Sequence, residues 1–102
     1  MKNLNALEEL ITMINIVKIY QTHCMPCKML TPILEKLQAE FTGRISVQSV
    51  NADNGIPELY SNMNIMSTPT LLFLKDGVLL EKISGLKTYN ELKELIDKLL
   101  KE

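Results

Sequence analysis

The sequence predicts an α/β domain in which helices cover both faces of one mixed β-sheet. Segments with helical and extended patterns alternate along the chain in the order α-β-α-β-α-β-β-α, which includes a hairpin. The strand segments are short and continuously apolar, as in strands that are buried on both faces. With 102 residues, 46% of them hydrophobic and 23% charged, the chain has the size and composition of a single domain over residues 1–102.

The first half of the chain predicts two helices and two strands. Apolar residues at helical spacing indicate a helix over residues 4–14, and the β-branched run 16–20 indicates a strand. A second helix, with its apolar stripe over residues 30–41, is expected to be kinked by Pro32. Residues 45–50 then predict the second strand.

The second half predicts a hairpin followed by the clearest helix of the chain. A turn at residues 54–58 leads into a short helix, with a proline in its first turn. Strands 70–74 and 78–84 are joined by an Asp-Gly pair, which is a strong hairpin signal. Thr88 and Glu91 form a capping box ahead of the last helix.

Charge and hydropathy exclude several classes of protein. The formal net charge of −1 leaves no basic surface for a phosphate backbone, so nucleic acid is not expected as a partner. Residues 2–9 are too polar for the apolar part of a secretory signal. The longest uncharged run, 59–74, is interrupted by polar residues and a proline, so no membrane span is expected. We therefore expect a cytoplasmic protein, in which a purely structural disulfide would be unusual.

Both cysteines of the chain, Cys24 and Cys27, lie between a predicted strand and a predicted helix. Cys24 is expected at the helix start, where free N–H groups and the helix dipole lower a thiol pKa. Cys27 follows one turn later on the same face, close enough to form a disulfide. Pro26 suits the first helical turn and stiffens the loop. This pattern favours a redox pair in which Cys24 attacks a substrate disulfide and Cys27 resolves the mixed disulfide.

Two other interpretations of the cysteines are weaker. A structural zinc site needs four ligands, and beyond Cys24 and Cys27 the sequence offers His23 and carboxylates, so no metal is expected. Two inert buried thiols are common in cytosolic proteins. Their placement between a strand and a helix makes this the minority interpretation.

From about residue 15 onward the sequence resembles the thioredoxin family. The motifs that carry the resemblance are Cys24-Met25-Pro26-Cys27-Lys28-Met29, Pro32, Val50-Asn51-Ala52-Asp53, Ser67-Thr68-Pro69-Thr70, the Asp76-Gly77 hairpin and Gly85. The resemblance implies a three-layer α/β/α sandwich. Because few residues precede the strand at 16–20, we expect a four-stranded sheet that lacks the family's first strand and has the strand at 45–50 on its edge.

The resemblance also implies an activity. A thioredoxin-like protein is a thiol–disulfide oxidoreductase that reduces protein disulfides as a monomer, with no bound cofactor beyond a reversible Cys24–Cys27 disulfide. Electrons would come from an NADPH-dependent flavin reductase. A cis peptide is implied between Thr68 and Pro69, and both residues are implied to contact substrate, with the backbone of Thr68 pairing with the substrate chain.

One departure from the family pattern lies on the predicted strand, six residues before the first cysteine. Lys18 stands where the family usually has a buried acid, and Ser49 stands where that acid has a lysine partner. We consider two hypotheses of equal weight for Lys18. Its ammonium group lies near Cys27 and favours the thiolate, which would make the protein a weaker reductant, or its side chain extends along the surface into solvent.

Two further departures lie in the loop itself. His23 replaces a tryptophan, and as an imidazolium it would stabilise the Cys24 thiolate, although it can also be plain loop surface. Met25 replaces a common glycine and adds apolar surface beside the nucleophile. Lys18, His23, Met25 and Pro26 are therefore the candidate redox-tuning residues. The altered residues also leave open a non-catalytic, partner-binding or chaperone-like module as the alternative function.

Overall fold

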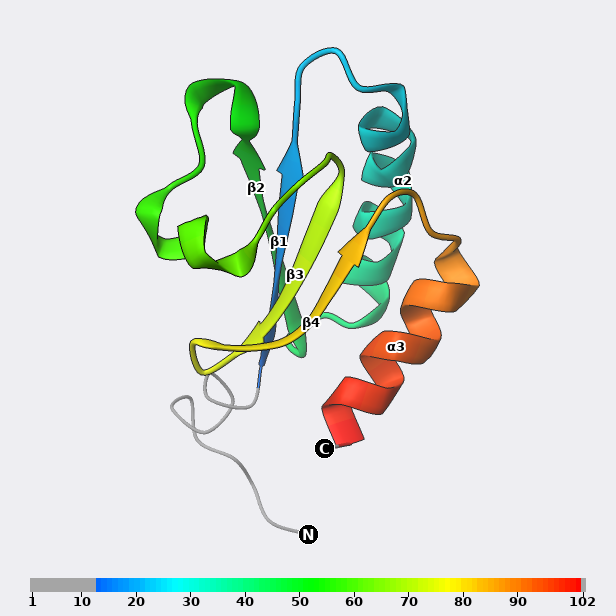
Figure 1. Ribbon diagram of the computed structural model, residues 1–102. Coiled ribbons are helices and arrows are strands. Elements are labelled where there is room, and N and C mark those ends of the chain that lie inside the picture. The colour runs from blue at the N-terminus through cyan, green and yellow to red at the C-terminus, as the bar shows by residue number, and fades with distance from the viewer. Residues whose placement is uncertain (1–12, 102) are drawn as a thin grey trace, which may run out of the picture.

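The computed structural model describes residues 13–101 (Figure 1). Its elements are β1 (Ile14–Tyr20), α2 (Met25–Glu40), β2 (Ile45–Asn51), the 3₁₀ helices η1 (Ala52–Asn54) and η2 (Glu58–Met63), β3 (Thr70–Lys75), β4 (Val78–Ser84) and α3 (Tyr89–Lys101). The helix predicted over residues 4–14 falls outside the described part of the chain except for its last two positions. None of the helices within residues 13–101 combines the length and hydropathy needed to cross a membrane.

Within the described residues the four strands form one mixed sheet in the order β2-β1-β3-β4. β1 pairs with β2 in parallel, whereas β3 pairs with both β1 and β4 in antiparallel fashion. β2 lies at an edge of the sheet, as the sequence predicted. The prediction of a mixed, four-stranded thioredoxin-like sandwich is confirmed.

The start of β1 corrects the sequence-based assignment. Ile14 was assigned to the end of a helix, but it is the first residue of β1 and pairs with Ile45. Its N–H donates to the carbonyl oxygen of Arg44 at 3.0 Å, and its side chain is fully buried. The spacing of Ile14 also fits a helix, so the pairing with β2 decides the assignment.

Two apolar clusters fill the space between the sheet and the segments that cover its two faces. One lies between the sheet and helices α2 and α3 and includes Ile14, Ile16, Leu30, Leu34, Leu37, Phe41, Ile45, Leu71, Phe73, Leu92, Ile96 and Leu99. The other lies under the η1–η2 segment and includes Val17, Ile19, Tyr60, Leu72 and Leu74. Figure 1 shows α2 and α3 on one side of the sheet and the 3₁₀ segment on the other.

The alternation of side chains along β1 places Lys18 on the helix side of the sheet. Ile14 and Ile16 point toward α2 and α3, whereas Val17 and Ile19 point toward the 3₁₀ segment. Because successive strand residues point to opposite faces, Lys18 shares its face with Ile14 and Ile16. A lysine in this position must lie beneath α2, the helix that carries the cysteines.

Local signals in the second half are confirmed. Asp76 and Gly77 both adopt positive φ, 51° and 79°, as a tight hairpin turn requires. Thr88 and Glu91 form the capping box, with Thr88 N–H donating to Glu91 Oε1 at 2.9 Å and Glu91 N–H donating to Thr88 Oγ1 at 3.1 Å. The predicted short helix is the 3₁₀ helix η2, with Pro57 as its N-cap rather than in its first turn. Pro32 lies inside α2, which continues as one helix through it.

Candidate active site

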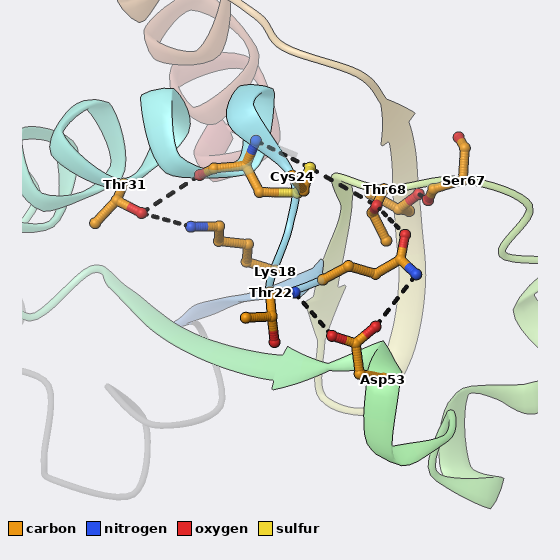
Figure 2. Close-up of a disulfide and its surroundings, with 10 residues drawn as sticks. Lys18, Thr22, Cys24, Thr31, Asp53, Ser67 and Thr68 are labelled. Carbon is orange, nitrogen blue, oxygen red and sulfur yellow. Dashed lines mark hydrogen bonds between the residues drawn. A yellow bond between two sulfur atoms is a disulfide. The ribbon is translucent and has the colours of Figure 1, made fainter.

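A disulfide joins Cys24 and Cys27 at the start of α2. The two Cα atoms lie 5.2 Å apart, which confirms the closeness that the spacing predicted. Cys24 is the N-cap of α2, and its Sγ accepts a hydrogen bond from the Cys27 N–H at 3.2 Å (Figure 2). An N-cap atom faces the unpaired N–H groups of the first turn, and these groups favour a negative charge. The site is therefore built to stabilise a thiolate at Cys24.

The two sulfurs differ in their accessibility. Cys24 is 9% exposed and Cys27 only 2%, so a large partner reaches Cys24 more readily. The side chains of His23, Met25 and Pro26 around Cys24 are exposed, and Met25 is 65% exposed. Within residues 13–101, no group of three or more His, Cys, Asp or Glu side chains is arranged to hold a metal ion.

The segment before β3 approaches Cys24 from the other side. The peptide between Thr68 and Pro69 is cis, as the resemblance implied. Thr68 Oγ1 lies 3.8 Å from Cys24 Sγ, and the carbonyl oxygen of Pro69 accepts a hydrogen bond from the Gly85 N–H at 2.8 Å. Gly85, a residue distant in sequence, thus tethers this segment beside the cysteines. Thr68 thus lies beside Cys24, with Pro69 next to it in the chain, and the contact of both residues with substrate stays a prediction.

A polar network that sequence reasoning missed supports this segment (Figure 2). Thr68 Oγ1 donates to Gln21 Oε1 at 2.7 Å, and Gln21 Nε2 donates to Asp53 Oδ1 at 3.3 Å. The other carboxylate oxygen of Asp53 accepts from the Thr22 N–H at 2.9 Å. Asp53 therefore fixes the loop before Cys24 and, through the side chain of Gln21, the hydroxyl group beside the sulfur.

Hydrogen bonding also changes the titration of Asp53. The bond from the Thr22 backbone, followed by that from the Thr22 side chain, holds the pKa of the Asp53 carboxyl below its usual value. Parallel pairing of β1 and β2 brings Tyr20 opposite Asn51, so the polar residues just after each strand lie at the same edge of the sheet. Polar residues following two neighbouring parallel strands were the sequence signal that could have revealed the network.

Lys18 lies beneath α2 and is buried, with 6% of its surface exposed. Its Nζ donates to Thr31 Oγ1 at 2.6 Å, and Thr31 Oγ1 in turn donates to the Cys27 carbonyl oxygen at 3.4 Å (Figure 2). Burial lowers the pKa of the Lys18 ammonium group, and the negative charge of Glu35 partly opposes this change. The side chain thus turns toward the helix that carries the cysteines instead of extending into solvent.

An open pocket of about 370 Å³ lies between the ends of β1 and β2 and the first turns of α2. Lys18 and Cys27 both line it, together with Tyr20, Gln21, Thr22, Lys28, Thr31, Ser49 and Asn51. Ser49, which pairs with Lys18 across β1 and β2, lines the same part of this pocket. Water can reach the surroundings of the less exposed cysteine through this pocket.

Comparison with known proteins agrees with this geometry. The Thioredoxin family model matches residues 4–98. A thioredoxin of Staphylococcus saprophyticus is 34% identical over 85 residues, which cover 83% of this chain and 81% of that protein. A thioredoxin of Staphylococcus aureus shows the same identity and coverage. The similarity thus extends over most of the chain and is not confined to the cysteine motif.

Proposed function

Because this chain belongs to the thioredoxin family and is a thiol–disulfide oxidoreductase, we propose that it reduces disulfides in other proteins, with Cys24 as the attacking nucleophile. The observation that supports this assignment is the position of Cys24 as the N-cap of α2, more exposed than Cys27. An N-cap thiolate is stabilised by the helix, and a partner can approach it without unfolding the site.

The proposed reaction is a pair of thiol–disulfide exchanges. The Cys24 thiolate attacks one sulfur of the substrate disulfide, and the other substrate sulfur leaves as a thiolate. Cys27 then loses its proton and attacks Cys24 Sγ, which releases the second substrate sulfur and leaves the Cys24–Cys27 disulfide. Two electrons must then be supplied to restore the dithiol, and we propose an NADPH-dependent flavin reductase as their source. The protein would act as a monomer in the cytoplasm.

Substrate recognition is proposed at the surface around Cys24. Thr68 Oγ1 is 3.8 Å from Cys24 Sγ, so a chain bonded to that sulfur would lie against Thr68 and Pro69. The backbone of Thr68 would pair with it in a strand-like manner. Met25 and Met66, 65% and 83% exposed, add flexible apolar surface that can adapt to different partners.

Trapping of mixed disulfides tests this proposal. In Cys27→Ser the first exchange can occur but resolution cannot, so substrate proteins should stay covalently bound to Cys24. Proteins from cells that express this variant would be separated on non-reducing gels. The double variant Cys24→Ser/Cys27→Ser is the matched control and should trap nothing. An equal set of proteins with both variants, or no trapped protein in either, would contradict the proposed function.

His23 is proposed to tune the nucleophile. We expect His23→Ala to raise the pKa of the Cys24 thiol by a few tenths of a unit, because an exposed imidazolium stabilises the neighbouring thiolate only through screened electrostatics. The rate of alkylation by iodoacetamide as a function of pH measures this pKa. His23→Lys, which keeps a positive charge at the same position, is the matched comparison and should retain the Cys24 pKa of the parent. An unchanged Cys24 pKa in His23→Ala would leave His23 as loop surface.

A further inference from the structure

Lys18 is a buried cation that the proposed exchange steps do not use. Its side chain is 6% exposed, and the acceptor that its Nζ reaches within residues 13–101 is the neutral hydroxyl of Thr31. A buried ammonium group that lacks a nearby anion is unfavourable. In the disulfide form neither cysteine carries a charge, and the negative charge of Glu35 only partly offsets the cost of burying the ammonium group.

The part of the redox centre that is linked to Lys18 is Cys27. A chain of two hydrogen bonds, through the hydroxyl of Thr31, connects Lys18 Nζ to the Cys27 carbonyl oxygen. Lys18 and Cys27 also line the same pocket of about 370 Å³. Once the disulfide is opened, the thiol of Cys27 is therefore a group near Lys18 that can become an anion.

The other charged and titratable groups around Lys18 come from the elements packed against it. Glu35 of α2 raises the pKa of the ammonium group, but less than burial lowers it. Tyr20 of β1 places its ring 5.6 Å from Nζ, and Lys28 of α2 lines the shared pocket. The neighbours on β2 and β3, Ser49 and Leu71, do not ionise near neutral pH.

We propose that the ammonium group of Lys18 stabilises the thiolate of Cys27 as Cys27 resolves the mixed disulfide, an inference that rests on the proposed exchange mechanism. In this step the S–H bond of Cys27 breaks and its proton passes to water in the pocket. The thiolate electron pair forms the bond to Cys24 Sγ, and the substrate sulfur leaves with the electrons of the bond that breaks. Lys18 keeps its proton throughout and acts through its charge, while Thr31 positions it.

The effect would be specific to the second exchange. Cys24 is already stabilised by the N-cap, whereas Cys27 is 2% exposed and one turn into the helix. Its thiolate would otherwise form in a poorly solvated position, which raises a thiol pKa. Lys18 thus provides the electrostatic stabilisation of the Cys27 thiolate that the helix start provides for the Cys24 thiolate.

Stopped-flow reaction of the reduced protein with Ellman's reagent separates the two exchanges. A bimolecular phase reports attack by Cys24, and a unimolecular phase reports release of the second thionitrobenzoate by Cys27. We expect Lys18→Met to slow the unimolecular phase about tenfold at pH 7 and to move its pH midpoint up by about one unit. The bimolecular phase should change less than about twofold.

Two further variants keep the test informative. Lys28→Met removes an equal charge from an exposed position next to Cys27 and should change neither phase more than about twofold. Thr31→Val leaves Lys18 in place but removes its anchor, and should raise the midpoint of the unimolecular phase by a smaller amount. This variant also serves if Lys18→Met does not fold.

Each result has a distinct meaning. Unimolecular profiles of Lys18→Met and Thr31→Val that superimpose on that of the parent would overturn the inference about Lys18. A parent protein in which Cys24 shows no bimolecular phase would instead overturn the proposed function. A slower unimolecular phase at all pH values with an unchanged midpoint would assign Lys18 a purely structural role and also reject the inference.

Discussion

Cys24→Ser is expected to lower the second-order rate constant for reduction of a protein disulfide by at least about a thousandfold, as does removal of a covalent nucleophile in other enzymes. The hydroxyl of serine does not ionise near neutral pH, whereas the helix start favours the thiolate of Cys24. The substitution suits the local structure because serine is a preferred N-cap. Its Oγ can replace the Sγ that accepts from the Cys27 N–H at 3.2 Å, so α2 should be retained.

Reduction of insulin by dithiothreitol, followed by turbidity, measures this loss. In a separate reaction without dithiothreitol, the matched variant Cys27→Ser should react once and stop as a mixed disulfide at Cys24. If Cys24→Ser instead formed the mixed disulfide and Cys27→Ser did not, Cys27 would be the attacking cysteine and Cys24 the resolving one. Turbidity with the parent protein no faster than with Cys24→Ser would favour the non-catalytic binding module.

The parts of the fold that were predicted correctly depend on local chemistry. The Asp76-Gly77 turn needs only residues that tolerate positive φ, and the Thr88–Glu91 capping box needs only its own helix start. Ile14 was assigned wrongly because its spacing fits a helix equally well. Its strand character comes from pairing with Ile45, a residue 31 positions away that no local pattern identifies.

The same distinction holds at the candidate site. The cysteine pair was predicted because one loop carries both residues, and the rigid helix start fixes their separation. The network from Asp53 through Gln21 to Thr68 joins three segments that meet only when β1, β2 and β3 are paired in their observed register. The sequence contains these residues, but it does not show that they come together in the folded protein.

The sequence left the orientation of Lys18 undecided for a related reason. A lysine flanked by Val17 and Ile19 points to one face of the sheet, and only the packing of helices onto that face shows what it meets. The face proves to be the one covered by α2, and Thr31 then draws the ammonium group toward Cys27. Burial of the charge is thus a consequence of strand register, not of the composition of β1.

Lys18→Met is expected to raise the free energy of unfolding of the disulfide form by about 2 kcal/mol near neutral pH, because it removes a poorly compensated buried cation. Methionine is unbranched and of similar length, so it can fill the same space. The gain should be smaller in the dithiol form, where a Cys27 thiolate would offset the lysine charge. Urea unfolding of both forms measures the two gains, and Lys28→Met should change either stability by less than about 0.5 kcal/mol.

The gain should also depend on pH with a definite sign. Burial lowers the pKa of folded Lys18 below the ordinary value of 10.5, which applies to the unfolded chain. Between these two values the unfolded state binds more protons, so the stability of the parent protein rises with pH. The destabilisation caused by the buried Lys18 charge is complete below the lowered pKa of the folded state, and it is relieved as the pH rises toward 10.5. The advantage of Lys18→Met should therefore shrink over this range, and an advantage that stays constant would contradict the assignment to Lys18.

The two stability gains are linked to the redox potential by a thermodynamic cycle. If Lys18→Met stabilises the disulfide form more than the dithiol form, the disulfide becomes harder to reduce and the potential falls. Each 1.4 kcal/mol of difference corresponds to about 30 mV for this two-electron couple. The potential measured against glutathione must then agree in sign and size with the unfolding data. Equal gains in the two forms, or an unchanged potential, would mean that Lys18 does not distinguish the redox states and that this protein's reducing power is set elsewhere.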